Sequence, residues 1–432
     1  MKLLHLDTPS QLEAIKTFFA SSWPADAHIR STVESIIREV REKGDSACLE
    51  YIRKFDGLSI SAHELEVSQD ELAQAVHSVS PELLRALHFA AENIRQFHER
   101  QRLSDWQILR PGVRLQERVI PIERVGVYVP GGRARYPSTV LMTVIPARIA
   151  GVRDIIMVSP PDRETGAIAA ELLAAAQIAG VDRIFKIGGA QAVAALAFGT
   201  ESIPAVDKIV GPGNAYVAEA KRQLFGTVGI DMIAGPTELA VLTDGSASPL
   251  WIVQDLFAQM EHDPMTRTMV VSTEKEVLEQ IQQIALQEME SKPRSQILQQ
   301  AWDQATLLVQ ADHLDLAVEA VNTFAPEHLQ LFLHEPHRVL PGIRNAAAIF
   351  IGPFSPAALG DYVAGPNHTL PTGGCARYAS ALGVYDFVKI QHIVEYDAEA
   401  CRREGAAAEI LAEQEQLFNH ALSLAIRHHQ QK

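Results

Sequence analysis

From about residue 119 the sequence alternates short apolar runs with longer helix-like stretches, and this alternation limits the possible folds more than any other feature. Strand, helix, strand, helix with short connections is the pattern of a parallel α/β sheet. The pattern pauses near residues 230–240, so we expect two α/β units with a boundary there. The runs that we expect to be strands are 125–129, 154–158, 183–187, 207–211, 239–244, 268–273, 305–310 and 347–352.

Both ends of the chain have a helical pattern. In residues 27–44 the apolar side chains recur at helical spacing, and Gly44 is a suitable C-terminal stop. Ser68 and Glu71 have the spacing of a capping box, which marks the start of another helix. From about Asp386 the chain is charged, and we expect it to be helical to its end.

Composition excludes several classes of protein. The formal net charge is −15, which disfavours a nucleic-acid partner because such a partner needs a basic face. No run approaches the roughly 20 apolar residues of a membrane helix, and the N-terminus lacks a signal-peptide core. The three cysteines stand far apart and in no metal-like spacing, which is typical of a reducing compartment. We therefore expect a cytoplasmic protein without a membrane partner.

Three glycine-marked turns, at residues 128–132, 187–191 and 210–214, each follow an expected strand and precede a helix. Backbone N–H groups at such turns suit a phosphate or another polar ligand. None of the turns matches G-x-G-x-x-G, and each one taken singly is more simply a tight turn. Together they are a stronger signal, because ligands bind at the carboxyl ends of parallel strands.

Two stretches place polar groups where a metal or a substrate could bind. Gln259 and His262 stand three apart in a helical pattern and so share one face of the helix. They could share a metal, although a polar helix end before Pro264 is the simpler explanation. Asp361 and His368 lie in a glycine- and proline-rich loop after the sheet, where functional groups are common.

Two further pairs of ionisable residues have both a structural and a chemical interpretation. Glu415 and His420 fall in the last helical stretch, where an ordinary structural histidine is expected. In Ala-Pro-Glu-His-Leu-Gln-Leu, Glu327 and His328 are neighbours beside an apolar run. A strand edge with side chains on opposite faces is the structural interpretation. A proton-transfer pair is the chemical one, because both groups can accept a proton near neutral pH when their surroundings tune them.

Eight motifs, in order and at matching spacing, resemble those of the zinc-dependent histidinol dehydrogenases. The resemblance runs from about residue 20 to residue 427, which is nearly the whole chain. A single motif would be weak, whereas eight in order are highly specific. The motifs are RVGVYVPGG, YPSTVLMTVIPARIAGV, IGGAQAVAALAFGT, GPGNAYVAEAKR, IDMIAGPTE, QMEHD, APEHLQL and GDYVAGPNHTLPT.

The resemblance implies oxidation of L-histidinol to L-histidine through L-histidinal, the last step of histidine biosynthesis, with two NAD⁺ used in turn at one site. It implies a homodimer with one zinc ion per subunit. The implied fold is two incomplete Rossmann-like units with parallel sheets, similar to aldehyde dehydrogenases, and small helical extensions at both ends. The alternative is a paralogue that oxidises another small polar alcohol, such as a sulfonated diol.

The resemblance also assigns roles to residues. His328 would take the protons of the alcohol and of the hydrated aldehyde, and Glu327 would activate water. Zinc would mainly hold the nitrogen atoms of the substrate. The residues that would contact NAD are Tyr128, Gln191 and Asn214. The zinc ligands would be Gln259, His262, Asp361 and His420. The substrate-binding residues would be Thr237, Gln259, His262, His328, Asp361, His368, Glu415 and His420.

The sequence departs from the family's usual pattern at a few positions. Thr237 stands where Ser is common, which keeps the hydroxyl group. Near Glu415, Gln416 and Asn419 are atypical, and relatives that oxidise other polar alcohols differ in this region. Glu415 and His368 are both present, and they suit an imidazole nitrogen and an amino group. We therefore expect histidinol as the substrate.

The resemblance gives an expected division of the chain. Residues 1–25 form an N-terminal extension, and 26–125 form a helical part and the first portion of α/β domain one. Residues 126–236 form α/β domain two, whose turns face NAD. Residues 237–380 complete domain one with the zinc and catalytic residues, and 381–432 form a helical tail that is exchanged in the dimer.

Two other classes of protein compete with a dehydrogenase. A zinc hydrolase also places Glu beside His near a metal to activate water, but the sequence has no H-E-x-x-H motif. A non-catalytic metal-binding protein has no need of the Glu327–His328 pair.

Overall fold

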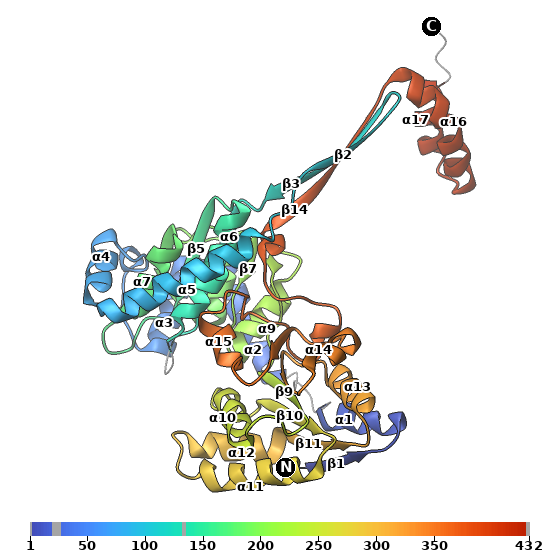
Figure 1. The fold of residues 1–432 in the computed structure, drawn as a ribbon. Coiled ribbons are helices and arrows are strands. Elements are labelled where there is room, and N and C mark those ends of the chain that lie inside the picture. Colours follow the sequence, from blue (N-terminus) through green and yellow to red (C-terminus); the bar gives the residue numbers. More distant parts are fainter. Residues whose placement is uncertain (1, 20–26, 132–134, 429–432) are drawn as a thin grey trace.

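The computed structural model describes residues 2–19, 27–131 and 135–428. Two α/β units form the body of the molecule, and an arm projects from one of them (Figure 1). Neighbouring strands in both sheets of the body run parallel, as the alternating pattern predicts. The predicted fold class of two parallel α/β units with terminal extensions is confirmed.

One unit is built on a six-stranded sheet. Its strands, in spatial order, are β1 (Lys2–Leu6), β11 (Thr306–Ala311), β10 (Arg267–Ser272), β9 (Glu238–Thr243), β12 (His328–Phe332) and β13 (Ala348–Ile351). Its helices are α1 (Glu13–Phe19), α10 (Pro249–Met260), α11 (Lys275–Met289), α12 (Ser295–Ala305), α13 (Leu314–Phe324), α14 (Pro336–Val339) and α15 (Ala357–Tyr362). The inner strands are apolar on both faces because α1 and α13 cover one face and α10, α11 and α12 cover the other.

The other unit is built on a five-stranded sheet. Its strands, in spatial order, are β6 (Arg183–Lys186), β5 (Asp154–Ser159), β4 (Arg124–Tyr128), β7 (Lys208–Val210) and β8 (Gly229–Ile230). Its helices are α2 (Ala27–Lys43), α3 (Asp45–Asp56), α4 (Gln69–Ser78), α5 (Pro81–Glu99), α6 (Pro137–Ala150), α7 (Ala170–Ala179), α8 (Gly189–Phe198) and α9 (Ala215–Leu224). Helices α4 to α7 cover one face, and α2, α3, α8 and α9 cover the other.

The structure divides the chain differently from the expected domains at two places. The helices within residues 26–125 pack on the five-stranded unit, with α2 against α8 and α9, α4 against α7, and α5 against α6. The expected N-terminal extension contributes β1, which pairs with β11 as an edge strand. Amphipathic spacing shows that a helix has a buried face, but it does not show which sheet receives that face. The break between the two sheets falls between β8 and β9, at the expected 230–240.

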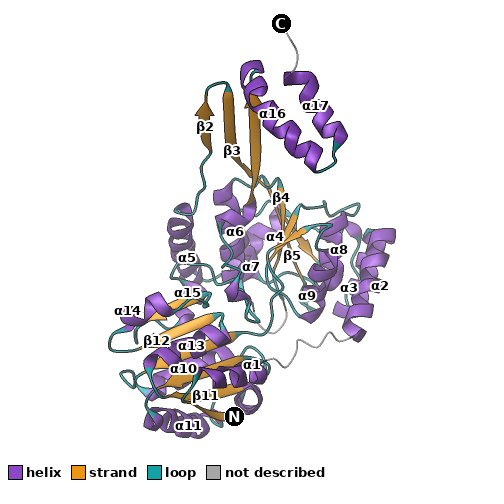
Figure 2. Cartoon of the chain, turned by 90° about the vertical axis from the view of Figure 1, so that its right-hand side faces the viewer, coloured by secondary structure: helices purple, strands orange, loops and turns teal. Residues whose placement is uncertain are grey.

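An arm of three antiparallel strands and two helices projects from the body (Figures 1 and 2). The arm consists of β2 (Trp106–Arg110), β3 (Val113–Pro121), β14 (Val388–Tyr396), α16 (Ala398–Gln414) and α17 (Phe418–His428). β3 pairs with β2 on one side and with β14 on the other. The expectation of helix from about Asp386 is therefore wrong for residues 388–396. Long-range pairing with β3, rather than a local pattern, makes this segment a strand.

Large apolar side chains are exposed along the arm. Each of the following is at least half exposed: Trp106, Leu109, Val394, Ile410, Leu411, Phe418, Leu422 and Ile426. Exposed apolar side chains gathered on one element are typical of an interaction site. The structure contains no helix, within its described ranges, that has both the length and the apolar character to cross a membrane.

Candidate active site

The pair of neighbouring ionisable residues lies in the interior of the six-stranded unit. His328 is the first residue of β12, which pairs with β9 on one side and β13 on the other. Glu327 directly precedes the strand. Glu327 is 8% exposed and His328 is 3% exposed. Glu327 Oε2 lies 3.6 Å from His328 Nδ1. The two groups are therefore on the same side, and the interpretation of a strand edge with opposed side chains does not hold.

The backbone of Glu238, at the start of β9, orients both members of the pair. Its N–H donates to Glu327 Oε2 over 3.0 Å. Its carbonyl lies 3.2 Å from His328 Nδ1, and because a carbonyl can only accept, Nδ1 must carry the proton. Neutral His328 then has a lone pair on Nε2. That atom is buried and has no hydrogen-bond partner among the described residues, although Asp361 Oδ1 is 3.5 Å away.

Burial and neighbouring charge shift the pKa values of the pair in the same direction. Burial raises the pKa of the Glu327 carboxyl to about 7, against the opposing effect of His328. Burial lowers the pKa of His328, but the negative charges of Glu327 and Asp361 outweigh it and raise the pKa to about 9. Both groups therefore titrate near the range in which a side chain can exchange protons with a substrate.

Asp361, at the end of α15, and His368, in the following loop, extend the site toward the five-stranded unit. His368 Nδ1 donates to the Asp361 carbonyl over 2.8 Å. His368 Nε2 lies 3.4 Å from Thr139 Oγ1 on α6. Burial raises the pKa of the Asp361 carboxyl, but His328 and the charges of His368 and His262 lower it below its ordinary value. The loop therefore places imidazole groups and a carboxylate at the junction of the two units.

The remaining expected ligands of zinc and substrate fall into two groups. Gln259 is buried at the end of α10, and His262 follows it, with its N–H 3.3 Å from the Gln259 carbonyl. Glu415 and His420 are exposed and lie on the arm, away from the body (Figure 1). Among the residues that the structure describes, no group of three or more His, Cys, Asp and Glu side chains could hold a metal. Within one chain, the four expected zinc ligands are not brought together.

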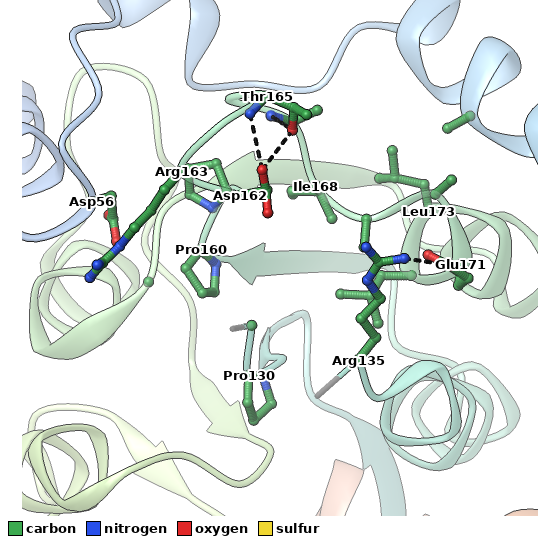
Figure 3. Close-up of a pocket in the computed structure, with 18 of the residues that line it drawn as sticks. Asp56, Pro130, Arg135, Pro160, Asp162, Arg163, Thr165, Ile168, Glu171 and Leu173 are labelled. Atoms are coloured by element: carbon green, nitrogen blue, oxygen red, sulfur yellow. Dashed lines mark hydrogen bonds and ion pairs between the residues drawn. The ribbon is translucent and has the colours of Figure 1, made fainter. Parts of the chain in front are cut away.

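A cavity of about 1640 Å³ opens at the carboxyl ends of β4, β5 and β6 (Figure 3). Tyr128, Gln191 and Asn214 all line it, as expected of residues that contact one ligand. The Tyr128 hydroxyl accepts from Gly189 N–H over 3.1 Å. Gln191 is 2% exposed, and its Oε1 has no partner among the described residues. Asn214 Oδ1 caps α9 by accepting from the N–H groups of Tyr216 and Val217.

The glycine-marked turns bring backbone into close contact around this cavity. A Cβ at Gly188 would lie 2.6 Å from Pro160 Cβ. A Cβ at Gly211 would lie 2.1 Å from the Tyr128 carbonyl, and its φ of +107° also disfavours other residues. The expected turns are thus part of the cavity wall, except that Gly132 lies outside the described residues.

Sequence reasoning missed several residues that shape the site. Glu238 acts through its backbone, so its side-chain type gives no signal of this role. Thr139 lies in a helix that is apolar on all sides, and only the fold brings it to His368. Asp56 and Arg163 line the cavity from segments that match no nucleotide-binding motif.

The fold and the site define an α/β enzyme with a buried acid–base pair and a large cavity at the carboxyl ends of a parallel sheet. A family model described as histidinol dehydrogenase matches residues 22–428. The histidinol dehydrogenase of Aromatoleum aromaticum is 47% identical, over 98% of this chain and 96% of its own. That of Syntrophotalea carbinolica is 46% identical over 99% of each chain. The crystal structure of histidinol dehydrogenase from Elizabethkingia anophelis has a TM-score of 0.92 and 34% identity, covering 99% of this chain and 98% of that one.

This chain belongs to the histidinol dehydrogenase family, whose members are NAD-dependent oxidoreductases. The resemblance inferred from the eight sequence motifs and the predicted enzyme class are confirmed.

Proposed function

We propose that this protein oxidises L-histidinol to L-histidine through L-histidinal, reducing two NAD⁺ at one site. The observation that carries the proposal is the orientation of the buried Glu327–His328 pair. The backbone of Glu238 holds both side chains and leaves His328 Nε2 free as a base. Full-length relatives named histidinol dehydrogenase support histidinol as the substrate.

His328 Nε2 is the proton acceptor for the alcohol. Removing a hydride from an alcohol carbon requires loss of the hydroxyl proton. The neutral form of His328, whose share rises as the pH approaches its pKa of about 9, can take that proton. The Nδ1–H bond to the Glu238 carbonyl keeps the ring in one orientation and stabilises the imidazolium that forms. Once that proton has been released to solvent, the same atom can take a proton from the hydrated aldehyde in the second oxidation.

Glu327 is the group that prepares water to attack the aldehyde. Its Oε2 accepts from the backbone N–H of Glu238, which fixes the carboxylate at the edge of the site. Burial raises the pKa of Glu327 to about 7, so the carboxylate is a stronger base than an exposed one. A base of this strength can take a proton from water and return it near neutral pH.

The body supplies three of the four expected zinc ligands: Gln259, His262 and Asp361. Together with a second imidazole, these donor atoms form a borderline set that suits zinc. His262 and Asp361 are close enough for the imidazole to lower the pKa of the carboxyl, and Gln259 precedes His262 on the same helix end. We assign the fourth ligand to His420 of a second chain. Zinc bound there would hold the imidazole and amino nitrogens of the substrate.

The arm supports a homodimer in which each chain completes the site of the other. Helix α17 carries His420, and Glu415 ends the preceding helix, yet both residues are exposed in one chain. The apolar side chains that surround them, including Phe418 at 73% exposure, have no partner surface on their own body. Burial against a second chain would stabilise them. Thr237, His368 and the other substrate residues of the body would then face Glu415 of the second chain.

The cavity of the five-stranded unit fits NAD. Its volume exceeds that of a dinucleotide, and its turns present backbone N–H groups at the first turn of α8, which suits a pyrophosphate. The unpartnered Gln191 Oε1 can accept from the cofactor. We place the reaction in the cytoplasm, which agrees with three cysteines that are all free.

Counting NADH per histidinol tests this function. Purified protein with limiting L-histidinol and excess NAD⁺ should form two NADH per substrate, because one base pair serves both oxidations. A ratio of one with free aldehyde would contradict the two-step reaction. Turnover of a sulfonated diol in place of histidinol would favour the alternative substrate instead.

A further inference from the structure

The carboxylate of Asp56 lies at the edge of the large cavity, and one of its oxygen atoms lacks a hydrogen-bond donor among the described residues. Asp56 is the last residue of α3, and both it and Phe55 line the cavity. Its Oδ2 is buried without a hydrogen-bond partner among the described residues. Burial raises the pKa of Asp56, and the nearby Arg163 opposes this shift. A buried carboxylate oxygen without a donor is costly, so this position suits a ligand that brings a hydroxyl group.

Arg163 stands beside Asp56, on the loop between β5 and α7 (Figure 3). Asp162 fixes this loop, because its Oδ1 accepts from the N–H groups of Glu164 and Thr165 at 3.0 Å each. Arg163 Nη2 donates to the Phe55 carbonyl over 2.9 Å. The guanidinium therefore bonds to backbone rather than forming an ion pair with the Asp56 carboxylate. The two opposite charges remain available to a ligand from one edge of the cavity.

The position of the catalytic residues indicates which end of the cofactor meets Asp56. The nicotinamide ring must approach His328, because the hydride leaves the carbon whose hydroxyl loses its proton there. Helix α6 begins two residues after Arg135, and its Thr139 lies 3.4 Å from His368 Nε2. The side of the cavity that holds Arg135 is therefore the one nearer to His368 and the acid–base pair. Asp56 is on the opposite side of the cavity (Figure 3), where the adenosine end would lie.

We propose that Asp56 selects NAD over NADP: its carboxylate accepts a hydrogen bond from the 2′-hydroxyl of the adenosine ribose and repels a 2′-phosphate. The inference rests on the proposed NAD site. Acidic side chains play this part in other nucleotide sites, and an arginine in the same place accommodates the 2′-phosphate. Here both charges are present, so removing the carboxylate would leave Arg163 to attract the phosphate.

Titrations of the full-length protein with NADH and NADPH test this, with nicotinamide fluorescence as the readout and no alcohol substrate. Asp56→Asn should bind NADH roughly 10-fold more weakly, because a charge-assisted hydrogen bond is lost, and NADPH roughly 10-fold more tightly. In the double variant Asp56→Asn, Arg163→Ala, NADPH should no longer bind more tightly than it binds the wild type. Glu50→Gln, which removes the same charge from an exposed position of α3, should leave the preference unchanged.

A third probe separates hydrogen bonding from a structural effect. NADH that lacks the 2′-hydroxyl of its adenosine should bind the wild type more weakly than NADH does, and Asp56→Asn should not distinguish the two. The inference would be overturned if Asp56→Asn changed the affinities for NADH and NADPH equally, or if the wild type did not bind NADH. Binding of NADH without NADH formation from histidinol would refute the proposed substrate while leaving this result intact.

Discussion

The expected acid–base pair is buried in the body, whereas the expected site residues of the arm are exposed. In the body, Glu327 and His328 are buried, and hydrogen bonds to the backbone of Glu238 fix both side chains. On the arm, Glu415 and His420 are exposed among unpaired apolar side chains. We propose that both groups serve one reaction, with the acid–base pair in the body of one chain and the remaining binding residues on the arm of a second chain.

This contrast teaches how to interpret the exposed apolar surface of the arm. A scattered exposed leucine is ordinary, whereas apolar side chains gathered along one projecting element are typical of an interaction surface. In the body, helices of the same chain cover both faces of the two sheets. Variants in the body should therefore affect chemistry within each chain, and variants in the arm should affect assembly.

The largest effect is expected from the base in the body. His328→Ala should lower turnover roughly 10²–10⁴-fold, the usual contribution of a positioned general base. His334→Ala is the matched control, because His334 follows the same strand and is exposed. Steady-state NADH formation measures both variants. A loss in His328→Ala no larger than in the control would remove His328 from the reaction.

A smaller effect is expected from one apolar residue on the arm. Leu422→Asp should weaken dimerisation roughly 10²–10³-fold, because each dimer would lose two buried leucines worth about 2 kcal/mol each. Ser423→Asp adds the same charge at the next exposed position and is the control. Light scattering over a dilution series measures the assembly. If Leu422→Asp dimerises as tightly as the wild type, the arm is not the interface.

A more selective effect is expected from the second member of the pair. Glu327→Gln keeps an oxygen for the Glu238 N–H but loses the negative charge. It should slow the oxidation of supplied histidinal by roughly 10²-fold and that of histidinol in its first step by less, because only the aldehyde needs activated water. Pre-steady-state NADH formation separates the two steps. Slowing of the alcohol step alone would reverse the roles of Glu327 and His328.

Most of the body could be predicted from the sequence, because local patterns determine it. Each of the eight expected apolar runs is a strand whose ends lie within two residues of the expected ones, since strands buried on both faces are continuously apolar. The short or peripheral strands β1 and β8 were not among the expected runs. The arm could not be predicted in this way. Every residue of β2 is exposed, and β14 is mostly exposed, so neither strand has the alternation of a half-buried strand. The pairing of β14 with β3 also joins segments more than 250 residues apart.

The site divides along similar lines. The eight motifs contain the Glu327–His328 pair, which the structure buries side by side, and Tyr128, Gln191 and Asn214, which line the cavity. They could not show that the Glu238 backbone fixes the histidine tautomer, because any residue type offers the same N–H and carbonyl. Nor could spacing show that Asp56 faces the cavity, since α3 reaches it only through packing on the five-stranded sheet.

The central claim is that the arm of one chain completes the site in the body of another. Refolding a mixture of His262→Ala and His420→Ala chains tests it most directly, with NADH formation as the measurement. Each homodimer should be nearly inactive, because both of its sites lack one ligand. About half the dimers in an equal mixture should contain one chain of each kind.

In such a mixed dimer, one site combines both lesions and the other combines an intact body with an intact arm. We therefore expect about a quarter of wild-type activity to return, since half the dimers carry one working site of two. If His420 instead served its own body, every site in a mixed dimer would carry one lesion. Mixed dimers shown to be present without any return of activity would contradict the account.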